Sequence, residues 1–458
     1  MAVIESLKFL DSSEISRHVN FLSFDRKEIQ RGFEATFITG QNGSNKSTLL
    51  RELVAALTVD ESSSVAYIAN SNKEYNHVLC MSGSIADRFP LKESPGGTRS
   101  KFDVPEYAYI GQRVGPNILS KRAPLETMLS FALDSEKSTR YQSDFFRHAH
   151  EIVGIESLVE FYFQRRITKS DKPFDLIKIL QKMASGVNTL KEAVDNKIGR
   201  KLTKLSQRTA TYLLEEFTYD EFTELENLIH KGGSRLRVVI GEGGIDSVSC
   251  SPNALRLGLL TGAISLSDAK VKSLSESKPF SIFELSSGEY HMYTSLLGLG
   301  FGITESSIVL IDEPENSLHP QWQREFMQSV FTICEGILKN GHLVVCTHSP
   351  LIVGTAVEGS SIVELSKTES KISSVRFGAS SDELLLSQFG VGSSRNNFVI
   401  DTVQRAVSLI ERGDFKNIEF LKLIPELEKI RESLSIDDPL TEVINVILDD
   451  EANDIREI

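Results

Sequence analysis

The chain has 458 residues, 40% of them hydrophobic and 25% charged, which is the composition of a globular protein with two or three domains' worth of core. Its net charge of −13 argues against a protein that coats nucleic acid with its whole surface. No apolar run reaches the roughly 18 residues of a membrane span, the N-terminus lacks a signal-peptide pattern, and the four cysteines lie far apart, so we expect a cytoplasmic protein without membrane contact, zinc or disulfides.

Residues 1–117 are expected to form an N-terminal lobe that consists mainly of strands. Short apolar runs separated by turn residues predict them at 19–25, 34–40, 64–70, 77–84 and 106–112. Residues 118–235 differ, because helical periodicity dominates there and Pro and Gly are sparse, as in 143–163 and 210–231. We therefore expect a helical insertion.

Residues 236–378 alternate between strands and helices. The expected strands are 234–242, 281–285, 306–314 and 342–350, and the expected helices are 288–303 and 320–340. Alternation of this kind predicts an α/β fold around a mostly parallel sheet with helices on both faces. Residues 379–458 have a helical pattern and are expected to form a C-terminal helical region.

The segment "FITGQNGSNKSTLL" almost matches the phosphate-binding pattern G-x-x-x-x-G-K-[ST]. An apolar strand leads in and an apolar helical pattern leads out, which would place phosphates at a helix N-terminus. Asn45 replaces the second glycine, and Asn tolerates positive φ better than other non-glycine residues. The candidate nucleotide-binding residues are Gly40, Asn42, Gly43, Ser44, Asn45, Lys46, Ser47 and Thr48.

The stretch "SIVLIDEPENSLHP" predicts a buried strand, 308–311, that ends in two carboxylates. Parallel sheets bind ligands at this edge. Asp312 is a candidate Mg²⁺ ligand, and Glu313 is a candidate catalytic base that polarises the attacking water. Alone, the pattern is also compatible with a strand that ends in an acidic turn.

Two further stretches are ambiguous when taken alone. In "LSSGEYHMY", Ser286, Ser287 and Gly288 precede a helix and suit a γ-phosphate, but they also fit an ordinary N-cap with Glu289 in the first turn. In "VVCTHSP", His348 follows a strand and would hydrogen-bond a γ-phosphate or position water. It would equally serve as a capping or core histidine.

Together these motifs have the order of an ABC-type ATPase head. The sequence resembles the soluble ABC-type ATPases of the RecF, Rad50 and OLD kind, because it contains "IDEPENSLHP" and "THSP". Within that branch it is most similar to stand-alone antiphage-defence ATPases of Septu, retron-associated and PARIS types. "CMSGSIADRFP" and "DELLLSQFGVGSSRNNFV" carry this part of the resemblance, and the insertion 118–235 is not covered by it.

The resemblance implies roles for individual residues. Lys46 would contact the β- and γ-phosphates, and Ser47 and Asp312 would hold Mg²⁺. Gln112, in "YIGQR", would be the glutamine-loop ligand of Mg²⁺ and water. Glu313 and His348 would be catalytic, as the base and the switch histidine. Ser286, Ser287 and Gly288 would act on the ATP of a partner protomer.

The resemblance also implies the assembly. In this family, the phosphate loop of one chain meets the signature motif of a second chain across a dimer interface, and here the signature motif would be Ser286, Ser287 and Gly288. A homodimer or larger homo-oligomer that sandwiches ATP is therefore expected. No acidic cluster on an apolar strand follows "THSP", so a nuclease effector would be separately encoded.

A basic stretch, 165–208, contains 12 Lys/Arg and four acids. Its local excess of positive charge predicts either a surface for DNA or an acidic phage protein, or a solvated helical face. The acidic C-terminal segment 448–458 is either a solvated tail or a docking segment for a basic partner.

The sequence therefore predicts a slow ATPase that acts as sensor and scaffold in antiphage defence and controls a nuclease. One alternative is a RecF/Rad50-like repair ATPase that clamps DNA as an ATP-bound dimer. A third class is a nucleotide-gated scaffold with negligible turnover.

Overall fold

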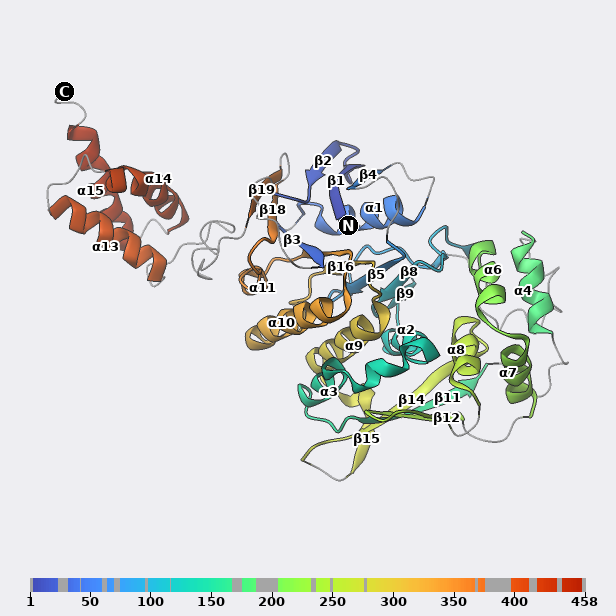
Figure 1. Cartoon of the computed structure of the whole chain (residues 1–458). Helices are drawn as coiled ribbons and strands as arrows, with labels where there is room; N and C mark the ends of the chain where they lie inside the picture. The colour runs from blue at the N-terminus through green and yellow to red at the C-terminus, as the bar shows by residue number, and fades with distance from the viewer. Residues whose placement is uncertain are drawn as a thin grey trace.

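A seven-stranded sheet lies at the centre of the molecule, with the strand order β19-β18-β3-β17-β16-β5-β8 (Figure 1). Neighbouring strands are parallel except β18 and β19. The expected α/β fold around a mostly parallel sheet is therefore confirmed. The strands are β3 (Phe33–Thr39), β5 (His77–Ser82), β8 (Tyr107–Ile110), β16 (Ser307–Asp312), β17 (Gly341–Cys346), β18 (Ser361–Leu365) and β19 (Ser370–Ser374). The computed structural model describes residues 3–23, 32–41, 43–59, 64–69, 75–94, 98–115, 117–166, 175–186, 205–231, 236–247, 250–275, 278–366, 370–374, 397–411, 418–434 and 439–454.

Helices cover both faces of this sheet. Along β16, Ile308 and Leu310 belong to the core on the side of α1 (Lys46–Thr58), whereas Val309 and Ile311 belong to the core on the opposite side. A strand that is buried on both faces is a continuous apolar run, which is why "IVLI" predicted it well. The opposite face is covered by α2 (Ala123–Ala132), α9 (Ser287–Gly302), α10 (Pro320–Ile337) and the short α11 (Pro350–Val353).

A smaller antiparallel sheet, β2-β1-β4, packs against α1. β1 (Val3–Leu10) was not expected from the sequence, and β2 (Ser16–Asn20) includes only the start of the expected strand 19–25. β4 (Val65–Ala69) lies within the expected range. Two short hairpins pair β6 (Glu93–Ser94) with β7 (Thr98–Arg99) and β9 (Arg113–Gly115) with β10 (Ile118–Leu119).

The middle of the chain contains a five-stranded antiparallel sheet, to which the region expected to be a helical insertion contributes the strand β11. Its order is β13-β12-β11-β14-β15, and β11 pairs with both β12 and β14. It therefore joins residues on both sides of the expected boundary at 235, while the domain boundaries themselves stay predictions. The strands are β11 (Leu158–Arg165), β12 (Leu236–Gly241), β13 (Gly244–Ser247), β14 (Ile264–Lys272) and β15 (Pro279–Ser281).

The expected helix 143–163 divides into a helix and a strand. α3 (Asp144–Glu151) ends shortly before Gly154, whose φ of 70° lies in the left-handed region. In β11, Val159, Phe161 and Phe163 are buried and alternate with polar residues, which is the period of a strand. The expected strand 281–285 is also wrong, because β15 is followed by the 3₁₀ helix η2 (Ile282–Glu284).

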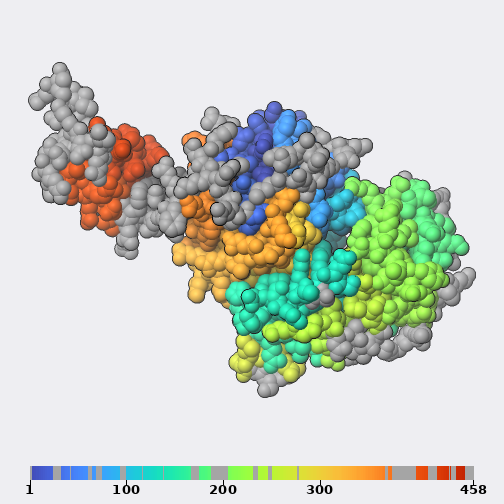
Figure 2. All heavy atoms as spheres, viewed as in Figure 1, coloured from blue at the N-terminus to red at the C-terminus, as the bar shows by residue number. Residues whose placement is uncertain are grey.

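The remaining helices of the middle region pack beside this sheet. They are η1 (Ser135–Gln142), α4 (Leu176–Ala184), α6 (Gln207–Glu216), α7 (Tyr219–Lys231) and α8 (Pro252–Leu260). Figure 2 shows the surface of α6 and α7 in green beside the blue N-terminal lobe.

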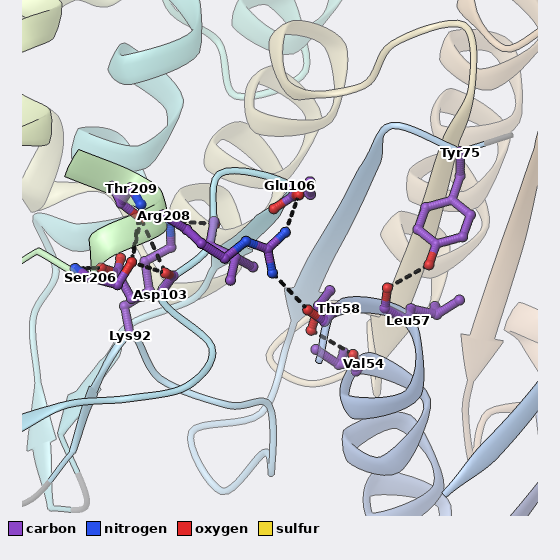
Figure 3. A network of polar contacts seen from close by, with 11 residues as sticks. Val54, Leu57, Thr58, Tyr75, Lys92, Asp103, Glu106, Ser206, Arg208 and Thr209 are labelled. Atoms are coloured by element: carbon purple, nitrogen blue, oxygen red, sulfur yellow. Dashed lines mark hydrogen bonds and ion pairs between the residues drawn. The ribbon is translucent and has the colours of Figure 1, made fainter. Parts of the chain in front are cut away.

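A polar network joins α6 to the N-terminal lobe (Figure 3). Ser206 caps α6 and donates its backbone N–H to the Asp103 carboxylate at 2.5 Å and its hydroxyl to the Asp103 carbonyl. Arg208 donates to Glu106 at 2.5 Å and to the carbonyl of Thr58, the last residue of α1, at 3.5 Å. These hydrogen bonds therefore connect α6 to the C-terminal end of α1, the helix that begins at the phosphate loop.

Three C-terminal helices form a separate core, in the region beyond residue 379 where the sequence has a helical pattern. They are α13 (Asn397–Glu411), α14 (Ile418–Ser433) and α15 (Pro439–Asp454), drawn in red in Figure 1. Residues 455–458 of the acidic C-terminal segment lie outside the described residues. Among the helices that the structure describes, none has the length and apolarity to cross a membrane.

Candidate functional site

The loop between β3 and α1 has the backbone conformation that the pattern requires. Gly40 has φ of 148°, and a Cβ there would lie 2.2 Å from the Leu365 carbonyl oxygen, so only glycine fits. Asn45 has φ of 72° and ψ of 24°, which is the left-handed conformation expected for the replaced glycine. Its side-chain carbonyl accepts a hydrogen bond from the Ser12 hydroxyl at 2.9 Å. Asn42, another candidate residue, lies outside the described residues.

Lys46 connects the loop with the end of β17. Its ammonium group donates to the Gly40 carbonyl at 2.9 Å and lies 2.7 Å from Nε2 of His348. Burial lowers the pKa of Lys46, and the nearby carboxylates of Glu313 and Asp312 oppose this shift. Lys46 and His348, which lie 302 residues apart in the sequence, therefore meet at this ammonium group.

Asp312 ends β16 and is 1% exposed. Burial raises its pKa to about 7, and a hydrogen bond with Ser47 opposes the shift. Its Oδ1 atom is buried and, within the described part of the chain, has no hydrogen-bond partner. A buried carboxylate oxygen beside a serine hydroxyl is the hard oxygen donor set that Mg²⁺ prefers, so Ser47 and Asp312 fit this ion.

Glu313 is held in one orientation by two side chains. Its Oε1 lies 3.3 Å from Nε2 of His348, and its Oε2 accepts a hydrogen bond from Asn316 at 2.8 Å. The interaction with His348 is the main reason that the pKa of Glu313 is lowered. Its φ of 48° is unusual for a non-glycine residue, and such backbone strain concentrates at functional sites.

Glu315 belongs to this site although the sequence patterns did not single it out. Its carboxylate accepts the backbone N–H of His348 at 2.6 Å, and burial raises its pKa. Glu315 therefore fixes the turn that carries His348. The acidic run in "DEPENS" was visible, but only the turn after β16 shows that the second glutamate points back to β17.

The signature residues form the N-cap that was one of the two alternatives. Ser286 caps α9 and exchanges hydrogen bonds with Glu289 at 3.3 and 2.8 Å. Both Ser286 and Ser287 are exposed, and a Cβ on Gly288 would lie 2.5 Å from the Ser317 carbonyl oxygen. No polar contact among the described residues joins them to the phosphate loop of the same chain.

Gln112 lies farther from the acidic strand than the sequence suggested. It follows β8, the outermost strand, and β5 separates β8 from β16. In the described structure, no polar contact brings the Gln112 side chain to Asp312 or Lys46. The residues directly beside Asp312 are those at the end of β5, because Ser82 pairs with Asp312.

Residues 253–354 match a family model described as "AAA domain, putative AbiEii toxin, Type IV TA system". This segment contains the signature, the acidic strand and the switch histidine. The chain has no match among curated protein sequences.

Similar solved structures include an Smc head bound to the C-terminal winged-helix domain of ScpA, with 13% identity, 82% of this chain and 98% of that chain covered, and a TM-score of 0.33. A Pyrococcus furiosus-derived Smc head with an extended coiled coil, bound to the C-terminal domain of ScpA, has 10% identity over 82% of this chain and 96% of that chain, with a TM-score of 0.33. An ATP-binding cassette of an ABC transporter in its ADP conformation has 11% identity over 84% and 93%, with a TM-score of 0.28.

Proposed function

We propose that this chain is a slow ABC-type ATPase that binds ATP with Mg²⁺. The observation that carries the proposal is the contact of Lys46 with His348 and, through it, with Glu313, beside the Ser47–Asp312 pair. Three sequence motifs with matching roles meet there, and this is unexpected for an ordinary strand–turn–helix. The family match over 253–354 agrees with this proposal.

Each side chain has a task in the proposed hydrolysis. Lys46 binds the outer phosphates, while the loop amides before α1 bind the remaining oxygens. Ser47 and Asp312 hold Mg²⁺, which supplies charge neutralisation on the phosphates when bound. Glu313, ionised and oriented by Asn316, orients and deprotonates the attacking water.

The proposed assembly is a homodimer or larger homo-oligomer. Among the described residues, the exposed serines Ser286 and Ser287 make no polar contact with the phosphate loop of their own chain, so a second protomer would complete each site. Ligand binding at such an interface stabilises the closed state.

Our proposal for the biological role is that of sensor and scaffold in antiphage defence, controlling a separately encoded nuclease. The description of the matching family, a toxin of a toxin–antitoxin system, agrees with a role in defence. The alternative is a DNA clamp, which the excess of positive charge in 165–208 favours. Seven basic residues of this stretch lie outside the described residues: Lys169, Lys172, Lys191, Lys197, Arg200, Lys201 and Lys204.

The test is a pull-down of tagged Glu313→Gln protein from its native host with ATP and Mg²⁺, recording bound protein and bound nucleic acid together. The substitution removes the water-activating carboxylate and should retain ATP. A stoichiometric nuclease with little DNA supports the defence role, and DNA without such a protein supports the clamp. If the variant matches wild type in both ATP retention and turnover, a scaffold with negligible turnover replaces both.

A further inference from the structure

The loop after β5 carries an arginine to the first turn of α1. Arg88 donates from Nη1 to the Thr48 hydroxyl at 2.7 Å. Thr48 is 1% exposed, whereas Arg88 is exposed. Within the described part of the chain, the guanidinium makes no other hydrogen bond or ion pair. Most of its donors therefore face solvent beside the start of α1.

This loop is rigidly built around one buried carboxylate. Asp87, 6% exposed, accepts hydrogen bonds from the Phe89 backbone at 3.0 Å, the Tyr109 hydroxyl at 2.6 Å and the Arg113 guanidinium at 2.8 Å. These three bonds fix the backbone on both sides of Arg88.

The same loop also runs against the end of the acidic strand. Gly83 donates its N–H to the Asp312 carbonyl at 3.0 Å. A Cβ on Gly83 would lie 2.3 Å from the Glu313 carbonyl oxygen, so the close approach requires glycine. The segment from Gly83 to Arg88 thus connects the acidic strand with the phosphate-loop helix.

We propose that Arg88 binds the phosphate groups of the nucleotide. This inference rests on the proposed ATP binding. Phosphate oxygens held by the first-turn amides of α1 lie within about 3 Å of those amides, and Thr48 belongs to that turn. A guanidinium bonded to the Thr48 hydroxyl is therefore within reach of them.

The chemistry favours an arginine here. The site contains the carboxylates of Asp312, Glu313 and Glu315, which lie near the ammonium group of Lys46 and the imidazole of His348. A second cation offsets their repulsion of a polyphosphate. The planar guanidinium stays protonated and binds two phosphate oxygens at once, which lysine does not.

The experiment measures the Kd of a fluorescent ATP analogue with Arg88→Ala, Arg88→Lys and wild-type protein between 50 and 300 mM NaCl. A charge-assisted contact predicts an increase in Kd of about 10- to 100-fold for Arg88→Ala, and a smaller one for Arg88→Lys. Kd should also depend less on salt in Arg88→Ala, because one ion contact is lost. A role in loop packing alone would not change the salt dependence.

Arg51→Ala is the matched control, since Arg51 is an exposed arginine of the same helix that pairs with Glu52. Its Kd should stay within twofold of wild type. Lys46→Ala separates the two proposals, because it should abolish binding at the phosphate loop. If wild type binds through Lys46 and Arg88→Ala stays within twofold, the inference about Arg88 is wrong and ATP binding stands. If wild type binds no ATP, both are wrong.

Discussion

Asn45 stands where phosphate loops have glycine. Replacing it tests how much its left-handed backbone conformation lowers the free energy of unfolding. In Asn45→Ala, a non-glycine residue without a local polar partner must keep a φ of 72°, which costs about 1 kcal/mol more than Asn. The exposed hydrogen bond from Ser12 is lost as well, at about 0.5–1 kcal/mol. Asn45→Ala should therefore destabilise the head by about 2 kcal/mol. Asn45→Gly loses the same bond but relieves the strain, so it should stay within about 1 kcal/mol of wild type.

The chain's single tryptophan makes this measurable. Trp322 is half-buried and packs against the core of the head, and α13–α15 contain no tryptophan. Urea unfolding followed by tryptophan fluorescence therefore reports on the head, and Asn45→Ala should lower its midpoint. Equal midpoints for Asn45→Ala and wild type, or equal losses for the alanine and glycine variants, would refute the assignment of strain to Asn45.

Three further predictions concern the rest of the head. Gly288→Ala forces a Cβ to within 2.5 Å of the Ser317 carbonyl. It should therefore lower the free energy of unfolding by about 1–3 kcal/mol and abolish ATP-dependent dimerisation, as measured by light scattering. A stable variant that still dimerises would contradict this. Glu315→Ala removes the acceptor of the His348 N–H. It should raise the activation free energy by about 1–3 kcal/mol and so lower kcat at least about tenfold, with the Kd of ATP nearly unchanged. An unchanged kcat in steady-state assays argues against a positioning role. Burial lowers the pKa of three histidines to about 3 or 4 in the folded chain, whereas in the unfolded chain they bind protons below about pH 6.5. Protonation therefore favours the unfolded state, and the urea midpoint should fall from pH 7 to pH 5. A constant midpoint would contradict their burial. They are His77, His150 and His291.

The sequence predicted the elements that are buried on both faces or that carry phosphate-loop chemistry. β16 and β17 are continuous apolar runs, and Asn45 adopts the backbone conformation expected from its side chain. It failed where local pattern is ambiguous. Because β11 continues the apolar pattern of α3, the sequence pattern predicts one long helix there. Only the pairing with β12 and β14 identifies β11 as a strand.

The site in the structure differs from the site expected from the sequence because of how the strands and turns are arranged in space. Gln112 follows a strand as expected, but strand order is a property of the whole sheet, and β5 occupies the place next to β16. Glu315 contributes through a turn that brings it to β17, which no spacing rule in the sequence describes. The contacts between segments that lie far apart in the sequence could therefore not be predicted from the local sequence pattern.

The network in Figure 3 contacts the C-terminal end of α1, and Lys46 makes the contacts at its other end. Lys46 is its first residue, and the carbonyls of Leu57 and Thr58 in its last turn accept hydrogen bonds from Tyr75 and Arg208. Thirteen residues make a rod of about 20 Å. We therefore expect a displacement of α6 to be passed to the ammonium group of Lys46 along a single helix, without any intervening loop.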